Sequence, residues 1–430
     1  MKYAKDNKIR TYLFYCIMFF IVIICIELLS QATFFIIFGK RYSAKNLRSY
    51  VVHKYEINDR RANFVNREVI HPYIGYVFDF GDEKKNFTSQ GFLTNISPVV
   101  KREPGKVNIV VLGGSVAAGL PKYIEQAWKK TFKAEPRLIN LACPGFKQPQ
   151  QLMALSYFLA LGAQYDLVIN VDGFNEIVLP YVENYEAGVN PFFPRSWEMR
   201  ISENPPPQVA AAMVKLKYLQ DIKQKRLAEL SGSMFNGSAA YGLIKMVQLI
   251  INNRDIYKSS MALLDVQKVS KKSFAESGPV THYANDTKMF EAVADVWYRC
   301  SLLMNDLAND NGFAYYHILQ PDQYLEGSKR LSREEKRLAY NEKHIYRQPV
   351  IIGYPLLQAR GRMLVKHHVN FFDATMVFAN IKETIYTDDC CHFNRKGKQI
   401  MADYIIQEIG RHNKFAKLKP ADALPKPVSY

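Results

Sequence analysis

Residues 107–115 of the chain read VNIVVLGGS. Five of the first six residues are apolar and four are β-branched, which is typical of a buried strand. The two glycines allow the chain to turn sharply, because glycine has no Cβ atom to clash. Ser115 is therefore expected at the carboxyl end of a buried strand, where open α/β sheets bind their ligands.

The alternation of strand-like and helix-like segments predicts the fold class. Four more apolar runs are expected to be strands, at residues 136–142, 166–171, 313–319 and 370–374. Helical periodicity recurs between them at residues 123–132, 152–159 and 289–309, and a last helix is expected from the N-cap Asn394 to just before Gly410. This order indicates an α/β fold with a parallel sheet that helices cover on both faces.

Five parts are expected along the chain. They are a short cytoplasmic head at residues 1–10, a membrane anchor at 11–38, an extension with short strands at 39–100, the main domain at 101–411 and a loose basic tail at 412–430. The βα rhythm stops between residues 181 and 285, so this segment is expected to be a partly helical insertion, with a helix at about 208–229.

The N-terminal segment predicts a location. Four basic residues precede a mostly apolar run at residues 11–38, which is long enough to cross a bilayer as a helix. Glu27 is expensive at mid-bilayer, so the span is expected at about residues 11–30. A cleaved signal peptide is the alternative, since Ser30-Gln31-Ala32 resembles a cleavage site, but the length of the run favours an uncleaved anchor. Basic residues flank both ends, and a short basic head usually stays in the cytoplasm, which would place the main domain on the periplasmic, lumenal or extracellular side.

Composition and charge indicate what kind of protein the chain is and which partners it would bind. The chain has 430 residues, and its 48% hydrophobic content excludes disorder as the overall state. The formal net charge is +17, yet no nucleic-acid-binding motif is present, so the basic surface is expected to face anionic lipid or glycan and not nucleic acid. Oligomeric state is left open.

The six cysteines do not form a disulfide scaffold. A single bridge from Cys143 to Cys390 or Cys391 and a set of free buried thiols are both open at this point. Neither Cys390-Cys391-His392 nor His367-His368 has an accompanying ligand set, so we expect no metal and no other cofactor.

Three further segments would join Ser115 at one edge of the sheet. Residues 140–145 follow the second strand, residues 172–176 follow the third, and residues 389–392 precede the last helix. A serine hydroxyl needs a base, a group that orients the base, and N–H donors for the developing oxyanion. His392 is the candidate base and Asp389 the candidate orienting acid, with Asp388 as the alternative. The candidate oxyanion donors are the N–H groups of Ser115 and Gly145 and the side-chain amide of Asn175.

Taken in this order, the segments resemble the conserved blocks of the SGNH (GDSL-type) hydrolase family. The matching residues are Gly113-Gly114-Ser115, Gly145, Gly173-Phe174-Asn175 and Asp389-Cys390-Cys391-His392, within a resemblance that covers residues 107–180 and about 286–411. It implies a three-layer, flavodoxin-like α/β/α sandwich around five parallel strands. It also implies a Ser115–His392–Asp389 triad with an oxyanion hole from Ser115, Gly145 and Asn175. Gly114 stands where aspartate is usual, and Glu176 replaces a common aspartate.

The resemblance implies a membrane-anchored serine esterase that hydrolyses an acyl ester, for example an acetyl ester, through an acyl-enzyme. Its substrate would be an acylated small molecule, glycan or lipid. Two alternatives stay open, because a triad does not choose between water and a sugar hydroxyl as the acceptor. One is an O-acyltransferase acting on extracellular or periplasmic glycan, and the other is a non-catalytic glycan-binding scaffold on the same fold.

Overall fold

A five-stranded parallel sheet forms the centre of the larger part of the chain. The computed structural model describes residues 2–39, 41–43, 46–47, 68–79, 90–201, 207–269, 272–279 and 281–411. The strands are β3 (Lys106–Gly113), β4 (Glu135–Asn140), β5 (Leu167–Asp172), β6 (Ala314–Leu319) and β7 (Asn370–Asp373). They lie in the order β4-β3-β5-β6-β7, and every pair is parallel. All five predicted strands are confirmed.

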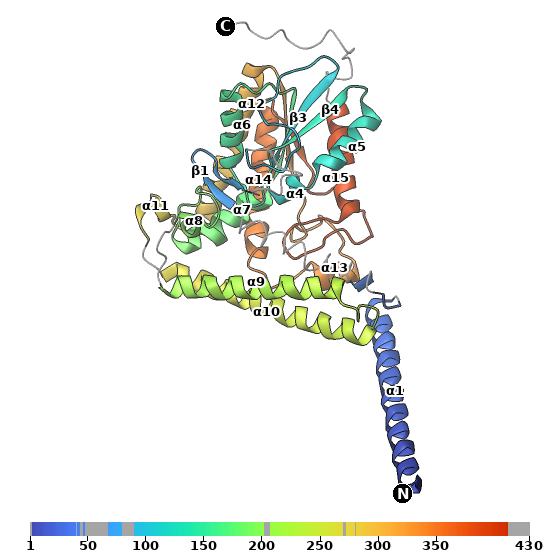
Figure 1. Cartoon of the computed structure of the whole chain (residues 1–430). Coiled ribbons are helices and arrows are strands. Elements are labelled where there is room, and N and C mark those ends of the chain that lie inside the picture. Colours follow the sequence, from blue (N-terminus) through green and yellow to red (C-terminus); the bar gives the residue numbers. More distant parts are fainter. Residues whose placement is uncertain are drawn as a thin grey trace. The chain divides into compact units, whose positions relative to one another are not determined.

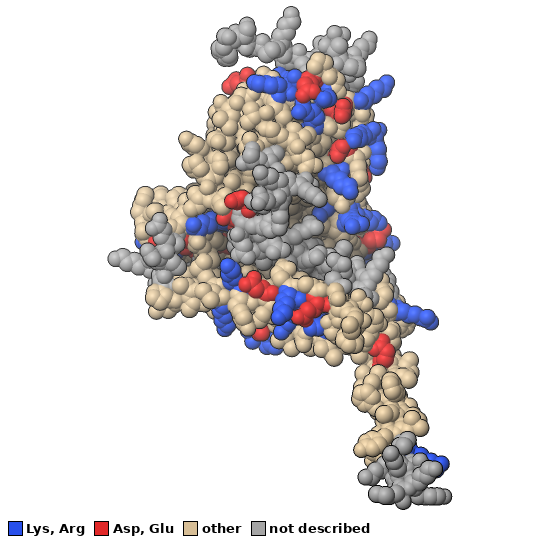
Figure 2. Space-filling model, in the orientation of Figure 1, with Lys and Arg blue, Asp and Glu red and all other residues tan. Residues whose placement is uncertain are grey.

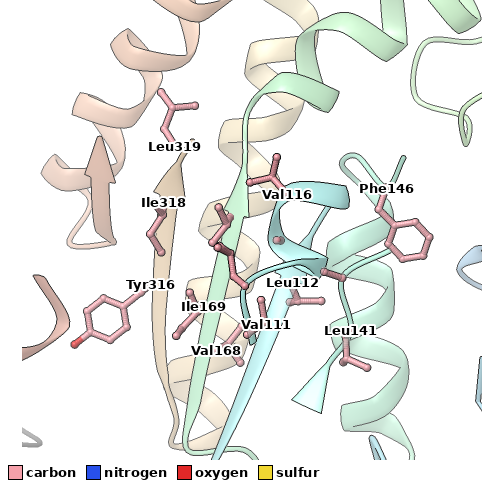
Figure 3. Packing of buried hydrophobic residues seen from close by; sticks show 14 of the residues in the cluster. Val111, Leu112, Val116, Leu141, Phe146, Val168, Ile169, Tyr316, Ile318 and Leu319 are labelled. Carbon is pink, nitrogen blue, oxygen red and sulfur yellow. The ribbon is translucent and has the colours of Figure 1, made fainter. Parts of the chain in front are cut away.

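Register places β3 between β4 and β5. Val111 pairs with Asn140 on one side and with Ile169 on the other. Because parallel strands with both faces covered lose contact with water, their side chains can be apolar throughout. Val110, Val111 and Leu112 are fully buried, and Figure 3 shows the side chains of β3, β5 and β6 packed together.

Helices cover both faces of the sheet, as the alternation predicts. The longer ones are α5 (Pro121–Thr131), α6 (Gln150–Ala160), α12 (Asp286–Asn311), α14 (Arg347–Lys366) and α15 (Arg395–Arg411). The shorter elements are α4 (Ser115–Ala118), α7 (Phe174–Leu179), η3 (Pro180–Asn184), η4 (Tyr185–Ala187), α8 (Trp197–Ile201), α11 (Phe274–Ser277) and α13 (Arg333–Leu338). Helix α5 packs against α15, whereas α12 packs against α6 and α14, and Figure 1 shows these two groups on opposite sides of the sheet.

Helix α14 is the main element of this layer that sequence patterns did not predict. It contains Pro355 in its interior together with two glycines, which usually weaken a helix. Tertiary packing explains the glycines. A Cβ atom at Gly353 would lie 2.1 Å from Ile177 of α7, and one at Gly361 would lie 2.2 Å from Phe371 of β7. The glycines therefore let α14 approach the sheet closely.

We expect Gly353→Ala to destabilise the fold, because the added methyl group would overlap Ile177. Overpacking of this kind costs about 1–3 kcal/mol. Gly410→Ala in α15 is the matched control, since its nearest neighbours lie 3.9 Å away. The control is expected to be neutral or to stabilise by up to about 1 kcal/mol. Thermal or urea unfolding of the two variants measures the difference, and equal stability would refute the packing argument.

The N-terminal helix and the middle of the predicted insertion form a separate unit. Contacts group Met1–Asp59 with Pro206–Val266, and Arg60–Pro205 with Gln267–Tyr430. The first unit contains α1 (Lys2–Phe38), α9 (Pro207–Gly232) and α10 (Ala239–Val269). The predicted helix at about 208–229 is confirmed as α9, and α10 was not predicted. The insertion is thus divided, because its two ends belong to the sheet-containing unit.

Helix α1 is long and apolar enough to cross a membrane over residues Arg10–Phe38, and its apolar window is not buried by other parts of the chain. Within the predicted extension, β1 (Glu68–His71) and β2 (Gly75–Phe78) form an antiparallel hairpin. The predicted tail at 412–430 lies outside the described residues. Figure 2 shows Lys and Arg side chains interspersed with Asp and Glu on the visible face, without one dominant basic patch.

Candidate active site

Ser115 lies immediately after the glycine turn that ends β3. Gly113 has a φ of +132°, and a Cβ atom there would lie 2.0 Å from the carbonyl oxygen of Val171. Only glycine fits this position without a shift in the backbone. Ser115 is the first residue of α4, so its N–H has no partner within the helix. The turn thus presents both the hydroxyl and the N–H of Ser115 at the sheet edge.

The structure brings Ser115 and His392 together, although 277 residues separate them. Ser115 Oγ and His392 Nε2 are 2.7 Å apart, within hydrogen-bond distance. His392 lies in a tight loop closed by the bridge between Tyr386 and Phe393 and by the hydrogen bond from Thr387 N–H to the His392 carbonyl. The His392 side chain is 12% exposed, so it is held by protein yet still reached by solvent.

The carboxylate beside His392 belongs to Asp388, which corrects the prediction of Asp389. Asp388 Oδ2 is 2.6 Å from His392 Nδ1, and the Asp388 side chain is almost fully buried. By contrast, the Asp389 side chain is 40% exposed, and its carboxylate lies 3.8 Å from His344 Nε2. With Nδ1 donating to Asp388, Nε2 is left as the acceptor that faces Ser115.

Backbone geometry explains this choice between the two aspartates. Asp388 Oδ1 accepts hydrogen bonds from the N–H groups of Cys390, Cys391 and His392. This loop therefore turns the Asp388 side chain inward, while Asp389 points toward solvent. Two consecutive aspartates leave no pattern in the sequence that shows which one faces inward. Only the fold of the loop determines which of the two aspartates faces His392.

A second buried carboxyl group lies near Asp388. Asp322 accepts a hydrogen bond from Tyr324 N–H. Burial raises the pKa of Asp322 to about 8, and the nearby charge of Asp388 adds to the rise. At neutral pH, Asp322 is therefore mainly a neutral acid. Asp388 is the carboxyl group that contacts His392 directly.

Asn175 lies against the glycine turn. Its Nδ2 donates a hydrogen bond to the Phe146 carbonyl at 2.7 Å, and among the described residues its second N–H has no protein acceptor. A Cβ atom at Gly114 would lie 2.1 Å from this Nδ2 atom. A larger side chain at position 114 would therefore displace Asn175.

The third expected donor, Gly145, lies in the loop after β4. Its φ is +82°, a conformation that favours glycine. No acceptor pairs with the Gly145 N–H in the part of the chain that the structure describes. The Gly145 N–H, the Ser115 N–H and the Asn175 amide are the donors that the sequence predicts. Whether these donors stabilise an oxyanion remains a prediction.

Two residues beside Gly145 were not predicted. A Cβ atom at Gly145 would lie 2.1 Å from Arg195 Cδ and 2.8 Å from the Tyr76 hydroxyl. Tyr76 donates to the Pro144 carbonyl at 2.8 Å, and Arg195 pairs with Glu183. They come from the N-terminal extension and the start of the insertion. No local motif could have shown that these two segments reach the loop after β4.

A second Ser–His–Asp set lies inside the protein. His317 is within 2.8 Å of Asp172 through Nε2 and within 2.7 Å of Ser301 through Nδ1. Trp297 also donates to Asp172 at 2.8 Å. The side chains of His317 and Asp172 are fully buried, so no substrate reaches them. We interpret this set as a satisfied polar network that joins β5, β6 and α12.

The cysteines are all thiols in the structure. Of the two options left open by the sequence, the structure therefore has free thiols and no bridge from Cys143. The sulfur atoms of Cys390 and Cys391 lie 3.3 Å apart, and together with His392 they form a cluster of possible metal-ligand atoms. Both ring nitrogens of His392 already face Ser115 and Asp388, so this cluster does not fit a metal without loss of those contacts.

No family model matches the chain, and no curated protein is detectably similar to it. Function must therefore be argued from the site itself.

Proposed function

We propose that the protein is a membrane-anchored serine hydrolase of the SGNH type that acts on acyl esters. The observation that carries the proposal is the continuous hydrogen-bonded chain from Ser115 Oγ through His392 to Asp388. Its order and atoms match the requirements of a serine nucleophile with a histidine base. The neighbouring donors supply a place for the negative charge that develops during the reaction.

In the proposed reaction, His392 Nε2 takes the proton of Ser115 as Oγ attacks the ester carbonyl carbon. The carbonyl oxygen becomes an oxyanion that the N–H groups of Ser115, Gly145 and Asn175 would bind. Collapse of the tetrahedral intermediate breaks the C–O bond, and His392 gives its proton to the leaving alcohol. Water then repeats the sequence on the acyl-enzyme and releases the acid and free Ser115. Asp388 holds the imidazole and stabilises its protonated form.

The location proposed for the enzyme follows from α1. Its apolar length over Arg10–Phe38 and the exposure of its most apolar 18 residues support a single membrane span. The short basic N-terminal segment favours a cytoplasmic start, which would put the remaining chain on the outer side of the membrane. Substrates on that side include acylated small molecules, glycans and lipids. The site as described does not select among them.

A fluorophosphonate probe tests the proposal directly, because it reacts covalently with activated serines. We expect the full chain to be labelled and peptide mass spectrometry to locate the label on Ser115. Ser301 is an internal control, since it also lies beside a histidine but is fully buried. A protein that stays unlabelled, or that carries the label elsewhere, would contradict the proposal.

A further inference from the structure

Helices α9 and α10 form an antiparallel hairpin that is held against α1. Three cross-links along the hairpin join Leu219 to Asn252, Arg226 to Gln248, and Glu229 to Lys245. At the hairpin turn, the Glu27 carboxylate of α1 accepts hydrogen bonds from the Ser238 hydroxyl and from the N–H groups of Ala239 and Ala240. Glu27 thus caps the start of α10, where a carboxylate satisfies unpaired donors and the helix dipole.

The same junction has a small apolar core of its own. Phe34 of α1, Tyr42 and Leu47 pack with Leu230, Met246 and Leu249 of the hairpin. The Tyr42 hydroxyl also donates to the Asn236 carbonyl in the turn, at 2.8 Å. The turn is therefore attached to α1 at Glu27. This residue lies about 17 residues beyond Arg10, where the apolar segment of α1 begins. A bilayer core about 30 Å thick takes about 20 helical residues, so Glu27 lies at a height close to a membrane surface.

The hairpin exposes apolar side chains at this height. Met234 and Phe235, at the tip of the turn, are 88% and 62% exposed. On α10, the exposed residues Ile244, Val247 and Ile251 follow the spacing of one helix face. The opposite face, which includes Met246 and Leu249, is buried. Helix α10 is therefore apolar on two faces, one that packs inside the hairpin core and one that is exposed. An exposed apolar stripe of this kind marks a surface for lipid or for another protein.

Charge on the hairpin matches an anionic membrane surface. Residues 207–269 contain nine Lys and Arg but only four Asp and Glu. The outer face of α10 continues after Ile251 with the exposed residues Arg254 and Lys258. The apolar half of this face lies near α1, and the basic half lies farther along the helix. Basic side chains beside an apolar stripe favour contact with anionic headgroups.

We propose that the tip and outer face of the α9–α10 hairpin lie in the membrane interface, on the side of the bilayer where α1 emerges. Met234, Phe235 and the apolar stripe of α10 contact lipid, and Arg254 and Lys258 contact anionic headgroups. The hairpin is continuous with α1, because Glu27 and the core around Phe34 attach it to the proposed anchor. The inference rests on that anchor and is independent of the hydrolase chemistry.

The test places an environment-sensitive fluorophore at single positions of the full chain. In a Cys16→Ala/Cys25→Ala background, cysteine replaces Phe235 or Val247 in the hairpin. The probe at Phe20→Cys reports the environment of α1 in the proposed anchor. The probe at Asp310→Cys, an exposed position on α12, is the control for a fluorophore in water. The four remaining native cysteines are buried, and the background protein corrects for any label on them. Each protein is studied in nanodiscs with or without phosphatidylglycerol and with lipid-borne doxyl quenchers.

We expect blue-shifted emission and a loss of fluorescence by doxyl quenching at positions 20, 235 and 247, but not at 310. The quenching at 235 and 247 should weaken when phosphatidylglycerol is omitted, and an Arg254→Glu/Lys258→Glu variant should weaken it similarly. Equal quenching in both bilayers would overturn the role given to these two cations.

Three other outcomes would overturn the inference in distinguishable ways. Quenching at 20, with the hairpin positions as water-exposed as 310, would refute the hairpin contact and leave the anchor. Hairpin probes that are shielded from water yet not quenched would mean that a protein covers this face. Absence of quenching at position 20 would refute the anchor together with the hairpin contact, without bearing on labelling of Ser115.

Discussion

Ser115→Ala is expected to lower kcat for small acyl esters by about six orders of magnitude, leaving a residual rate about 10³–10⁴-fold above that of the uncatalysed reaction. The reason is that the variant has no oxygen to form the acyl-enzyme, while His392 and Asp388 remain in place. Hydrolysis of a chromogenic acetate ester by the purified full chain in detergent measures the loss. The side chain of Ser115 caps no helix, since Gly114 is the N-cap of α4.

Unfolding temperature is the control for this variant. We expect it to change little, because the contact with His392 is the one hydrogen bond of the Ser115 hydroxyl among the residues that the structure describes. A folded variant that kept the turnover of the natural protein would show that Ser115 is not the nucleophile. A large fall in the unfolding temperature would contradict the expectation that the Ser115 hydroxyl has no major structural role.

The second large effect is expected from Asp388→Asn. An amide at 388 could donate to His392 Nδ1, which would favour the tautomer with the proton on Nε2 and block proton transfer from Ser115. Loss of the orienting carboxylate in serine hydrolases lowers kcat by about 10⁴-fold. Steady-state kinetics over pH 6–9 measures the effect, with KM followed separately.

Asp389→Asn is the matched control, because it is the same substitution one residue away. Its carboxylate is exposed and 3.8 Å from His344, so we expect kcat within about twofold of the natural protein. Comparison of Asp388→Asn with Asp389→Asn tests whether Asp388 is the carboxylate that orients His392. If Asp389→Asn caused the larger loss, the contact between Asp388 and His392 would not be the one used in catalysis.

Much of the sheet could be predicted from local patterns. The run at residues 107–112 is apolar on both faces, and only a strand covered on both sides accommodates it; β3 is fully buried after its first residue. The helices with clear hydrophobic periodicity could also be predicted from local pattern. Helix α14 was not, because Pro355, Gly353 and Gly361 hide its periodicity and are explained only by its neighbours.

The candidate site likewise has residues that the sequence predicts and contacts that only the fold determines. Ser115 and His392 follow recognisable turns, so their positions could be inferred before their contact was seen. The choice between Asp388 and Asp389 depends on three backbone N–H groups of one loop, and Arg195 and Tyr76 reach Gly145 from distant segments. Contacts of this kind depend on the path of the chain and leave no spacing in the sequence.

Residue pattern alone was therefore enough for the strands, the glycine turn before Ser115 and the apolar segment of α1, since each depends on neighbours within a few residues. Tertiary structure decided which aspartate faces His392 and why Glu27 interrupts an apolar helix. Glu27 caps α10 from 212 residues away, and that role exists only once the two helices meet. The physical reason is that hydrophobic periodicity is local, whereas the pairing of a partly buried charge is set by whichever donors the fold brings to it.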